Sequence, residues 1–399
     1  MTVVFDPLDP EQLADPFPTY RALRAEQPVQ RIEVGGGTWV VSRYEDVKQL
    51  VRTTEGLMQP PGVLAPPELA GGAAERIHRG LMVLNDPPVH TRLRKLTEKA
   101  LTRGAVERLR AHVDEVVTDC LDDMLERGEV DAVASLAFPV PLRVICGMLG
   151  IPEADREAML AWTPDFFRIF VPSANDAAGI EACHRACQNF IDYIGEQIAF
   201  RRRTPGDDIF SALVQAEDAG DRLSHDELVA TVLSLLTGGF DTTMGMIAAG
   251  VHGLAHQPDQ LAALRADPPG VAGSAVDEFV RVESPVGVTF RHFTEDVEIA
   301  GTTVPAGDPI WLLLLSANHD ERQFADPDAL DVTRKPNRHV AFGGARHFCI
   351  GNQLARLEGG VVFREIGRRI GSIEPAGDAP RRPNFQFRSF LTLPVKVAG

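Results

Sequence analysis

The chain has 399 residues, of which 44% are hydrophobic, so it can bury a large core. Its formal net charge of −16 at pH 7 argues against nucleic acid or an anionic membrane as the main partner, because phosphate groups bind to basic surfaces. Since no stretch approaches the ~18 apolar residues of a membrane span, and the N-terminus lacks the basic start and apolar run of a signal peptide, we expect a soluble, cytoplasmic protein.

The first 80 residues predict short elements of mixed type. A helix is expected over residues 16–26, then a hairpin whose strands, 29–34 and 38–42, flank three consecutive glycines. A second helix is expected over residues 44–52. Residues 58–80 are rich in proline and glycine and predict a long irregular segment, of the kind that is usually functional or disordered.

Helical periodicity dominates from residue 87 to about residue 264, and its longest run covers residues 223–256. Short strands are expected after that, at residues 297–299 and 309–315. The sequence therefore predicts a mainly α protein with minor β-structure. No linker or internal repeat interrupts it, so we expect a single domain over residues 1–399. The β-rich part of this domain is expected near residues 29–42 and 289–315.

Cys349 has the most informative surroundings of the five cysteines, which show no disulfide or zinc framework. It lies in Phe342-Gly343-Gly344-Ala345-Arg346-His347-Phe348-Cys349-Ile350-Gly351, just before a helix expected over residues 352–369. Small residues let the backbone wrap closely around a sulfur atom, and the start of a helix favours a negative charge on it. A metal-bound thiolate fits this pattern, whereas a lone cysteine would more often be a small buried packing residue.

Two adjacent glycines lie inside the long predicted helix, in Leu236-Thr237-Gly238-Gly239-Phe240-Asp241-Thr242-Thr243. Each costs about 1 kcal/mol relative to alanine within a helix. One reading is a close crossing with another helix. The other is that the missing side chains open room for a ligand, while a weakened hydrogen-bond ladder admits water beside Asp241 and Thr242.

Two further segments are weak signals when taken alone. Asp86-Pro87-Pro88-Val89-His90-Thr91-Arg92-Leu93-Arg94 starts a helix on which His90 and Arg94 share a face, as on many solvated helices. Glu278 and Arg281 are three residues apart, the spacing of an ordinary helical ion pair.

Together these segments resemble the cytochrome P450 family, over residues 16–395. The family patterns F-G-x-G-x-H-x-C-x-G, A-G-x-[DE]-T, E-x-x-R and D-P-P-x-H-x-x-x-R all occur here in the family's order. Two positions depart from them. Ala345 replaces a glycine, at a cost of about 1 kcal/mol if that position needs a positive φ, and Gly238 replaces an alanine.

The resemblance implies the P450 fold, with haem b between the long central helix and the cysteine loop. Cys349 would be the axial iron ligand. His90 and Arg94 would hold one haem propionate, and Arg291 and His347 the other, since a buried dianion needs such cations. The full set of cofactor-binding residues implied is His90, Arg94, Arg291, Phe342, Gly343, His347, Cys349 and Gly351.

The resemblance also implies roles around the cofactor. Thr242 would hydrogen-bond the bound dioxygen, and Asp241 would belong to the proton-delivery path. Glu278, Arg281 and Arg334 would form a buried structural ion cluster. The substrate pocket is expected among residues 58–83, 162–170, 235–238, 286–289 and 385–390, with Met82, Leu235, Gly238, Val286, Val288 and Phe387 as its named members.

The implied activity is that of a haem-thiolate monooxygenase, which inserts one atom of O2 into a hydrophobic small molecule. Hydroxylation is favoured, with epoxidation or dealkylation open, and a place in secondary metabolism is expected. A monomer of this size without a flavin or ferredoxin domain must receive its electrons, ultimately from NAD(P)H, through a reductase and a small acidic ferredoxin. The basic residues Arg92, Lys95, Lys99, Arg346 and Arg356 are expected to steer that partner.

Two alternatives stay open: a peroxide-driven peroxygenase, and a non-catalytic haem sensor or partner-binding protein. Peroxygenases of the family usually lack the acid and alcohol pair, and non-catalytic relatives typically lose the cysteine or the threonine. Asp241, Thr242 and Cys349 therefore count against both alternatives. The sequence does not choose the substrate.

Overall fold

The computed structural model describes residues 3–172, 175–218 and 223–399. Helices make up most of it, as predicted. They are α1 (Pro10–Ala14), α2 (Phe17–Glu26), α3 (Tyr44–Arg52), α4 (Ala73–Gly80), α5 (Val89–Ala100), α6 (Arg103–Arg108), α7 (Arg110–Arg127), α8 (Pro139–Leu149), α9 (Arg156–Phe166), α10 (Ala177–Arg203), α11 (Ile209–Asp218), α12 (His225–His256), α13 (Pro258–Ala266), α14 (Pro268–Glu283), α15 (Leu314–Asn318) and α16 (Asn352–Arg369).

The strands form three small sheets. The four-stranded sheet has the order β1-β2-β7-β4, with β2 and β7 parallel and the other two pairs antiparallel. A three-stranded sheet, β3-β9-β8, and the hairpin β5-β6 complete the set. The bounds are β1 (Val29–Ile32), β2 (Thr38–Val41), β3 (Glu129–Asp131), β4 (Val288–Arg291), β5 (Val297–Ile299), β6 (Thr302–Val304), β7 (Ile310–Leu313), β8 (Ser372–Pro375) and β9 (Pro394–Ala398).

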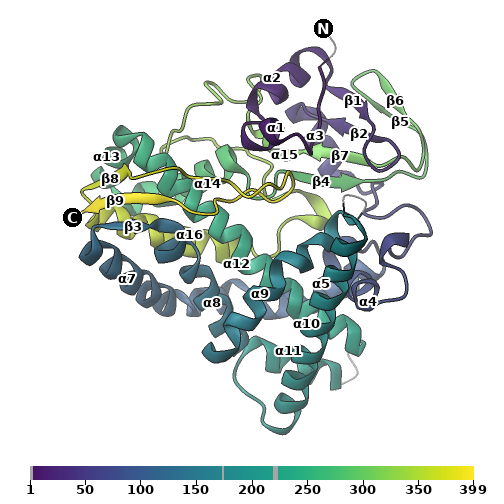
Figure 1. Ribbon diagram of the computed structural model, residues 1–399, viewed down its shortest axis with the longest axis horizontal. Coiled ribbons are helices and arrows are strands. Elements are labelled where there is room, and N and C mark those ends of the chain that lie inside the picture. The colour runs from purple at the N-terminus through teal and green to yellow at the C-terminus, as the bar shows by residue number, and fades with distance from the viewer. Residues whose placement is uncertain (1–2, 173–174, 219–222) are drawn as a thin grey trace.

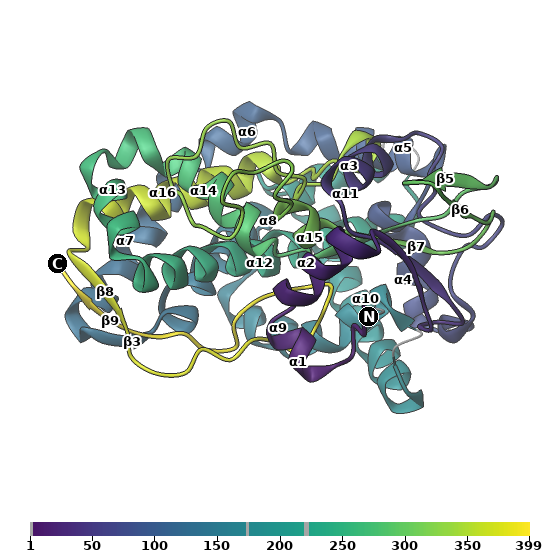
Figure 2. The same cartoon turned by 90° about the horizontal axis from the view of Figure 1, so that it is seen from above.

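Helix α12 runs through the middle of the molecule, with the four-stranded sheet toward one end and the β3-β9-β8 sheet toward the other (Figures 1 and 2). It begins with a capping box, in which the Ser224 hydroxyl accepts from the amide of Glu227 and the Glu227 carboxylate accepts from the amide of Ser224. Helices α4, α8, α14 and α16 pack against it. This helix therefore forms the centre of the hydrophobic core.

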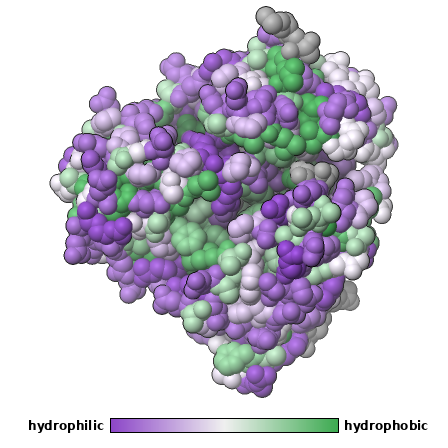
Figure 3. Space-filling view, viewed as in Figure 1, coloured by the Kyte–Doolittle hydropathy of each residue, from purple (hydrophilic) through white to green (hydrophobic). Residues whose placement is uncertain are grey.

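Within the described part of the chain, α12 alone has the length and apolar composition of a membrane-crossing helix. Most of its apolar window is buried inside the protein, as expected for a core helix. The face seen in Figure 3 is largely hydrophilic, with hydrophobic side chains gathered in a hollow near its centre.

The prediction of an irregular segment over residues 58–80 is wrong in its last part, where α4 forms. Gly72 is the N-cap of α4, so the glycines of this segment precede a helix instead of excluding one. Ala74 and Ile77 are buried on the face of α4 that packs on α12. A Cβ at Gly80 would lie 2.6 Å from the Cβ of Ala230, so the closeness of this helix pair requires glycine.

Candidate active site

A cavity of about 320 Å³ lies between α12 and the loop that carries Cys349. The pocket residues predicted from the sequence all line it: Met82, Leu235, Gly238, Val286, Val288 and Phe387. Of the predicted cofactor residues, His90, Arg94, Phe342, Gly343, His347, Cys349 and Gly351 line the same cavity. The structure thus brings two residue sets that are distant in sequence to one space.

The cysteine loop folds back on itself so that its sulfur faces the cavity. The amide of Cys349 donates to the carbonyl of Phe342 at 2.9 Å. Gly343 lies in the left-handed region, with φ of 69°, and makes the turn at the start of the loop. A Cβ at Gly351 would lie 4.0 Å from the Cys349 sulfur, an ordinary van der Waals contact. The loop therefore needs glycine at position 343, where the chain turns.

The environment of the Cys349 sulfur suits a thiolate once a cation binds to it. Burial raises the pKa of the free thiol, while the backbone amides of Gly351 and Asn352 donate hydrogen bonds to the sulfur and oppose that rise. Arg94 and Arg356 act in the same sense as these amides. The same donors would stabilise the negative charge of a thiolate bound to a metal ion, because hydrogen bonds to the sulfur tune such a thiolate.

Ala345 has φ of 47°, so the position that departs from the family's glycine does adopt a left-handed conformation. The preceding residue, Gly344, packs against α3, where an added Cβ would lie 3.0 Å from Cγ of Arg52. Alanine pays a steric cost in this region that glycine does not. The loop keeps its path nevertheless, because hydrogen bonds on both sides of Ala345 fix it, including Phe348 N to Ala345 O at 3.1 Å.

Three basic side chains carry buried nitrogen atoms without a hydrogen-bond partner; two of them line the cavity, and Arg291 does not. These atoms are Nδ1 of His90, Nε2 of His347 and Nε of Arg291. The rings of His90 and His347 are 4.3 Å apart at their centroids. Burial lowers the pKa of Arg291 to about 10 and also lowers that of both histidines. Unpaired buried donors of this kind fit an anionic ligand such as the propionates of haem.

Arg94 is bonded to the cysteine loop itself, whereas the terminal nitrogens of Arg291 donate to the carbonyls of Phe290 and Val51 and only its Nε lacks a partner. The Nη1 of Arg94 donates to the carbonyls of Arg346 and Phe348, at 2.9 and 2.7 Å, and its Nε pairs with Glu98. Arg94 thereby ties α5 to the cysteine loop. Its predicted contact with a propionate would add to this bracing.

The two glycines of α12 serve both of the purposes that the sequence left open. A Cβ at Gly239 would lie 2.8 Å from Cδ1 of Ile145, so this glycine permits the close crossing of α8 and α12. A Cβ at Gly238 would meet no atom within 4 Å, and this glycine opens onto the cavity. Helix α12 continues without a break through this point, and the Thr242 hydroxyl donates to the Gly238 carbonyl at 2.8 Å, where it competes with the helix's own hydrogen bond.

Asp241 and Thr242 point to different surroundings. Thr242 lines the cavity, whereas Asp241 does not. The Asp241 carboxylate is buried and accepts from Nη1 of Arg382 through both oxygens, at 3.0 and 3.2 Å. Sequence reasoning missed Arg382, because it lies 141 residues away in an irregular segment that matches no motif.

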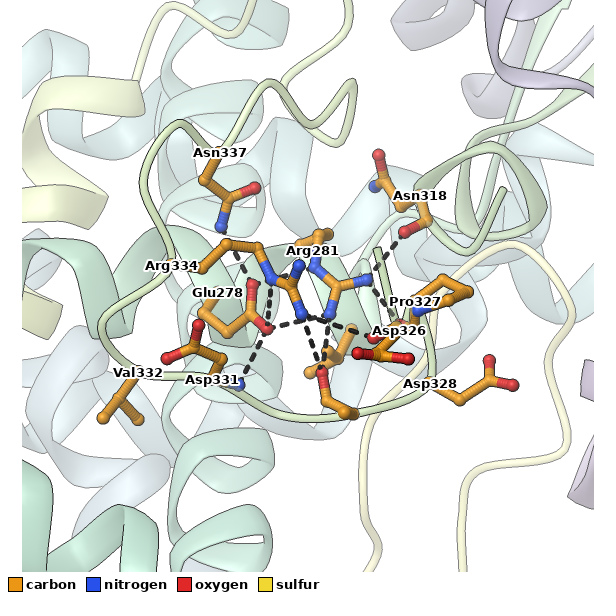
Figure 4. Close-up of polar contacts among 12 residues, drawn as sticks. Glu278, Arg281, Asn318, Asp326, Pro327, Asp328, Asp331, Val332, Arg334 and Asn337 are labelled. Carbon is orange, nitrogen blue, oxygen red and sulfur yellow. Dashed lines mark hydrogen bonds and ion pairs between the residues drawn. The ribbon is translucent and has the colours of Figure 1, made fainter. Parts of the chain in front are cut away.

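Glu278, Arg281 and Arg334 meet in the buried cluster that the resemblance implies (Figure 4). Arg281 makes two 2.8 Å bonds to the Glu278 carboxylate, and Arg334 makes one at 3.1 Å. The Nη1 of Arg281 donates to the backbone carbonyls of residues 318 and 327, and its Nη2 donates also to that of residue 329. The cluster fastens α14 to the segment that leads into the cysteine loop.

Aromatic rings form part of the cavity wall. Phe387 lies 4.8 Å from Phe167 and 5.5 Å from Phe170 between ring centroids, and all three line the cavity. Within the predicted range 162–170, Trp162 does not line it. Its ring instead packs edge-on against Phe190 of α10, at 5.2 Å, because α9 turns this position toward α10.

The predicted basic stripe on α5 is partly neutralised. Arg92 forms an ion pair with Glu227 at the start of α12, with Nη1 to Oε2 at 3.0 Å. Lys95 and Lys99 are exposed and line a surface groove beside it. Arg356 is bonded to Asp277, and its guanidinium lies 4.5 Å over the ring of Phe342. Lys95 and Arg346 are therefore the better candidates for contact with a partner.

A cavity bounded by a loop-held cysteine, by basic side chains and by a helix with an acid and an alcohol fits a haem-thiolate site. Comparisons with known proteins agree. The cytochrome P450 family pattern matches residues 16–397. Cytochrome P450 107B1 of Saccharopolyspora erythraea is 39% identical over 93% of this chain and 92% of the relative. The 6-deoxyerythronolide B hydroxylase of the same organism is 34% identical, with both chains fully covered.

Solved structures show the same relationship. P450BioI, in complex with an acyl carrier protein ligated to hexadec-9Z-enoic acid, superimposes with a TM-score of 0.90. It is 30% identical and covers 97% of this chain and 100% of its own. The chain belongs to the cytochrome P450 family. This result confirms the predicted family, its mainly α fold and its enzyme class, the monooxygenases among the oxidoreductases.

Proposed function

We propose that this P450 hydroxylates an uncharged, hydrophobic small molecule with haem b bound at Cys349. The observation that carries the proposal is the apolar cavity enclosed between Gly238 and Thr242 of α12 and the Cys349 sulfur. Haem supplies oxygen activation when it is bound there. In the overall reaction one atom of O2 enters a substrate C–H bond and the other leaves as water, with two electrons and two protons consumed.

The polarity of the cavity supports an uncharged substrate. Among the described residues no carboxylate lines it, and its basic residues, His90, Arg94 and His347, lie toward the cysteine loop. Away from that side the polar side chains lining it include Ser234, Thr289 and Gln386, which can hydrogen-bond one or two oxygen atoms of a substrate. A buried charge without a partner is costly. An alcohol, ketone or lactone on a hydrocarbon frame therefore fits this cavity.

The chain's own residues are suited to deliver protons. Thr242 faces the cavity with a hydroxyl that can both donate and accept, and Asp241 lies one residue earlier, on the side away from it. We assign Thr242 to hold the reacting oxygen in place and Asp241 to pass protons toward it. Both residues count against the peroxygenase and sensor alternatives, which need no such pair.

Electrons are proposed to come from NAD(P)H through a reductase and a small acidic ferredoxin that docks beside the cysteine loop. Phe348 is exposed in that loop, with Lys95 and Lys99 exposed on α5 and Arg346 two residues before it. An exposed apolar residue together with basic residues on the same loop and on α5 suits an acidic partner. We further propose that the protein is a cytoplasmic monomer. We also propose one functional domain, since the cavity takes walls from β4 as well as from the helices.

The relatives favour secondary metabolism. One is named as a hydroxylase of 6-deoxyerythronolide B, and another, from Streptomyces venezuelae, as the monooxygenase PikC at 37% identity. A further relative, P450BioI, is solved in complex with an acyl carrier protein ligated to hexadec-9Z-enoic acid. The substrate of this P450 is accordingly proposed to be a biosynthetic intermediate or a compound of similar apolarity.

The reduced carbon monoxide complex tests the proposal directly. Wild-type protein should show the strongly red-shifted Soret band of thiolate ligation, and Cys349→His should lose that shift while still binding haem. Uncharged and carboxylate-bearing ligands of matched size should then be compared by optical titration. Only the uncharged ligands should displace the water bound to the iron. A histidine-type spectrum in the folded wild-type protein would contradict the assignment of Cys349.

A further inference from the structure

The ion pair between Asp241 and Arg382 joins the central helix to the C-terminal segment. Asp241 is 4% exposed, and both of its oxygens lie within hydrogen-bond distance of one Arg382 nitrogen. The Arg382 side chain is 30% exposed. The buried carboxylate therefore meets solvent through this arginine, on the side of α12 that does not line the cavity.

The backbone around Arg382 is fixed independently of its side chain. Its amide donates to the carbonyl of Ser389 at 2.9 Å, and the neighbouring residues Arg381 and Phe390 form a β-bridge. Asn384 accepts from the amides of residues 386 and 387, which hold the cavity wall. Replacing the Arg382 side chain should thus leave both the turn and the cavity wall in place.

Two opposing effects act on the Asp241 carboxyl. Burial raises its pKa, and the charge and hydrogen bonds of Arg382 lower it, so that the net direction is upward. The nearby charged residues Glu283, Arg381 and Arg388 pair among themselves. Arg382 is therefore the charged side chain in the described structure that decides how easily Asp241 ionises.

We propose that Arg382 is a positioning residue for Asp241, which holds the buried carboxylate beside its own partly exposed side chain so that Asp241 can take up protons and pass them inward. The inference rests on the proposed proton-delivery role of Asp241. To that role the inference adds the place where protons leave bulk water. It also adds Arg382, a residue outside every motif of the family. A merely structural ion pair would instead tether the C-terminal turn to α12.

Turnover of the haem-loaded enzyme provides the first test. Asp241→Asn should slow product formation roughly 10²-fold. Arg382→Gln should fall between wild type and Asp241→Asn, and Arg382→Lys should recover part of the loss. In the double variant Arg382→Gln/Asp241→Asn the arginine change should add nothing, because both changes act on one step. Arg368→Gln, at a surface ion pair with a 60% exposed arginine, is the matched control and should match wild type.

The pH dependence of stability provides a second test that does not depend on turnover. A raised folded pKa means that the neutral Asp241 carboxyl contributes stability below its unfolded pKa, and that this contribution is lost as pH rises through the folded pKa. Without Arg382 the folded pKa rises further. Urea midpoints of Arg382→Gln should therefore match wild type near pH 4 and fall progressively below it toward pH 7. The difference should vanish when Asp241→Asn is the background.

The outcomes separate the two proposals. If Asp241→Asn turns over as fast as wild type, the proton role of Asp241 fails. If Asp241→Asn is slow while Arg382→Gln is not, the proposed role of Arg382 is refuted and that of Asp241 is not. A loss of stability in Arg382→Gln that is equal at all pH values and persists in the Asp241→Asn background would show that the pair only tethers the turn.

Discussion

Gly238 and Gly239 are neighbours in α12, yet one opens onto the cavity and the other touches Ile145 of α8. Gly238→Ala should leave stability unchanged or raise it by up to about 1 kcal/mol, because alanine is the better helix former and its methyl meets no atom. The same methyl should reduce the affinity of bulky ligands, which titration by optical difference spectroscopy would measure.

Gly239→Ala is the matched comparison and should behave in the opposite way. Its methyl would have to displace Cδ1 of Ile145, at 2.8 Å, so the free energy of unfolding should fall by about 1–3 kcal/mol. Urea denaturation of both variants tests this. Equal stability losses in the two variants would mean that the glycines do not differ as the structure shows.

Thr242→Ala should keep haem content and ligand affinity near wild type while diverting reducing equivalents into hydrogen peroxide. The reason is that Thr242 lines the cavity but makes its hydrogen bond only to the Gly238 carbonyl of its own helix, so the fold does not depend on it. The ratio of peroxide to product per NAD(P)H consumed is the measurement. Thr242→Ser retains the hydroxyl and should stay coupled. Full coupling in the alanine variant would exclude this role for Thr242.

Ala345→Gly should raise the free energy of unfolding by up to about 1 kcal/mol, because φ of 47° strains alanine and not glycine. The greater freedom of glycine in the unfolded chain offsets part of the gain. Ala355→Gly, inside α16, is the control and should destabilise the protein by about 1 kcal/mol. A lower stability for Ala345→Gly than for wild type would show that the loop is not strained at this residue.

Glu278→Ala should cost about 3–5 kcal/mol, because it leaves the fully buried Arg281 guanidinium without its counter-charge. Glu181→Ala removes a surface ion pair with Arg185 and should change stability by no more than about 1 kcal/mol. Thermal unfolding of both variants makes the comparison. Similar small losses would mean that the buried cluster does not fasten α14 as proposed.

Sequence patterns predicted the parts of this protein whose chemistry requires particular residue types at a fixed local spacing. The Cys349 loop, the glycine pair on α12 and the strands β1, β2, β5 and β7 belong to this group. Arg382 could not be found in this way, because its partner Asp241 is brought to it only by the tertiary fold. The same holds for Arg92, which on α5 looks like part of a solvated basic face until α12 places Glu227 beside it. Contacts between distant elements leave no local period in the sequence.

Electron transfer from an acidic donor should depend on Lys95 and Arg346 more than on Arg92. Lys95 is exposed on α5 and Arg346 belongs to the cysteine loop, whereas the charge of Arg92 is matched by Glu227. Charges beside the docking site raise the association rate at low salt, and salt screens them. Reversing Lys95 and Arg346 to Glu should therefore slow the first reduction roughly tenfold at low ionic strength and flatten its salt dependence.

Stopped-flow reduction by an acidic ferredoxin measures this rate, with ligand binding as the check that the cavity is intact. Lys396→Glu is the control, since Lys396 is an exposed lysine on β9, at the other end of the molecule from the four-stranded sheet (Figure 2). It makes the same charge change as each single reversal of Lys95 or Arg346, and should leave the rate unaltered. If Lys396→Glu slows reduction as much as the Lys95 and Arg346 reversals do, net charge and not a docking surface governs the encounter.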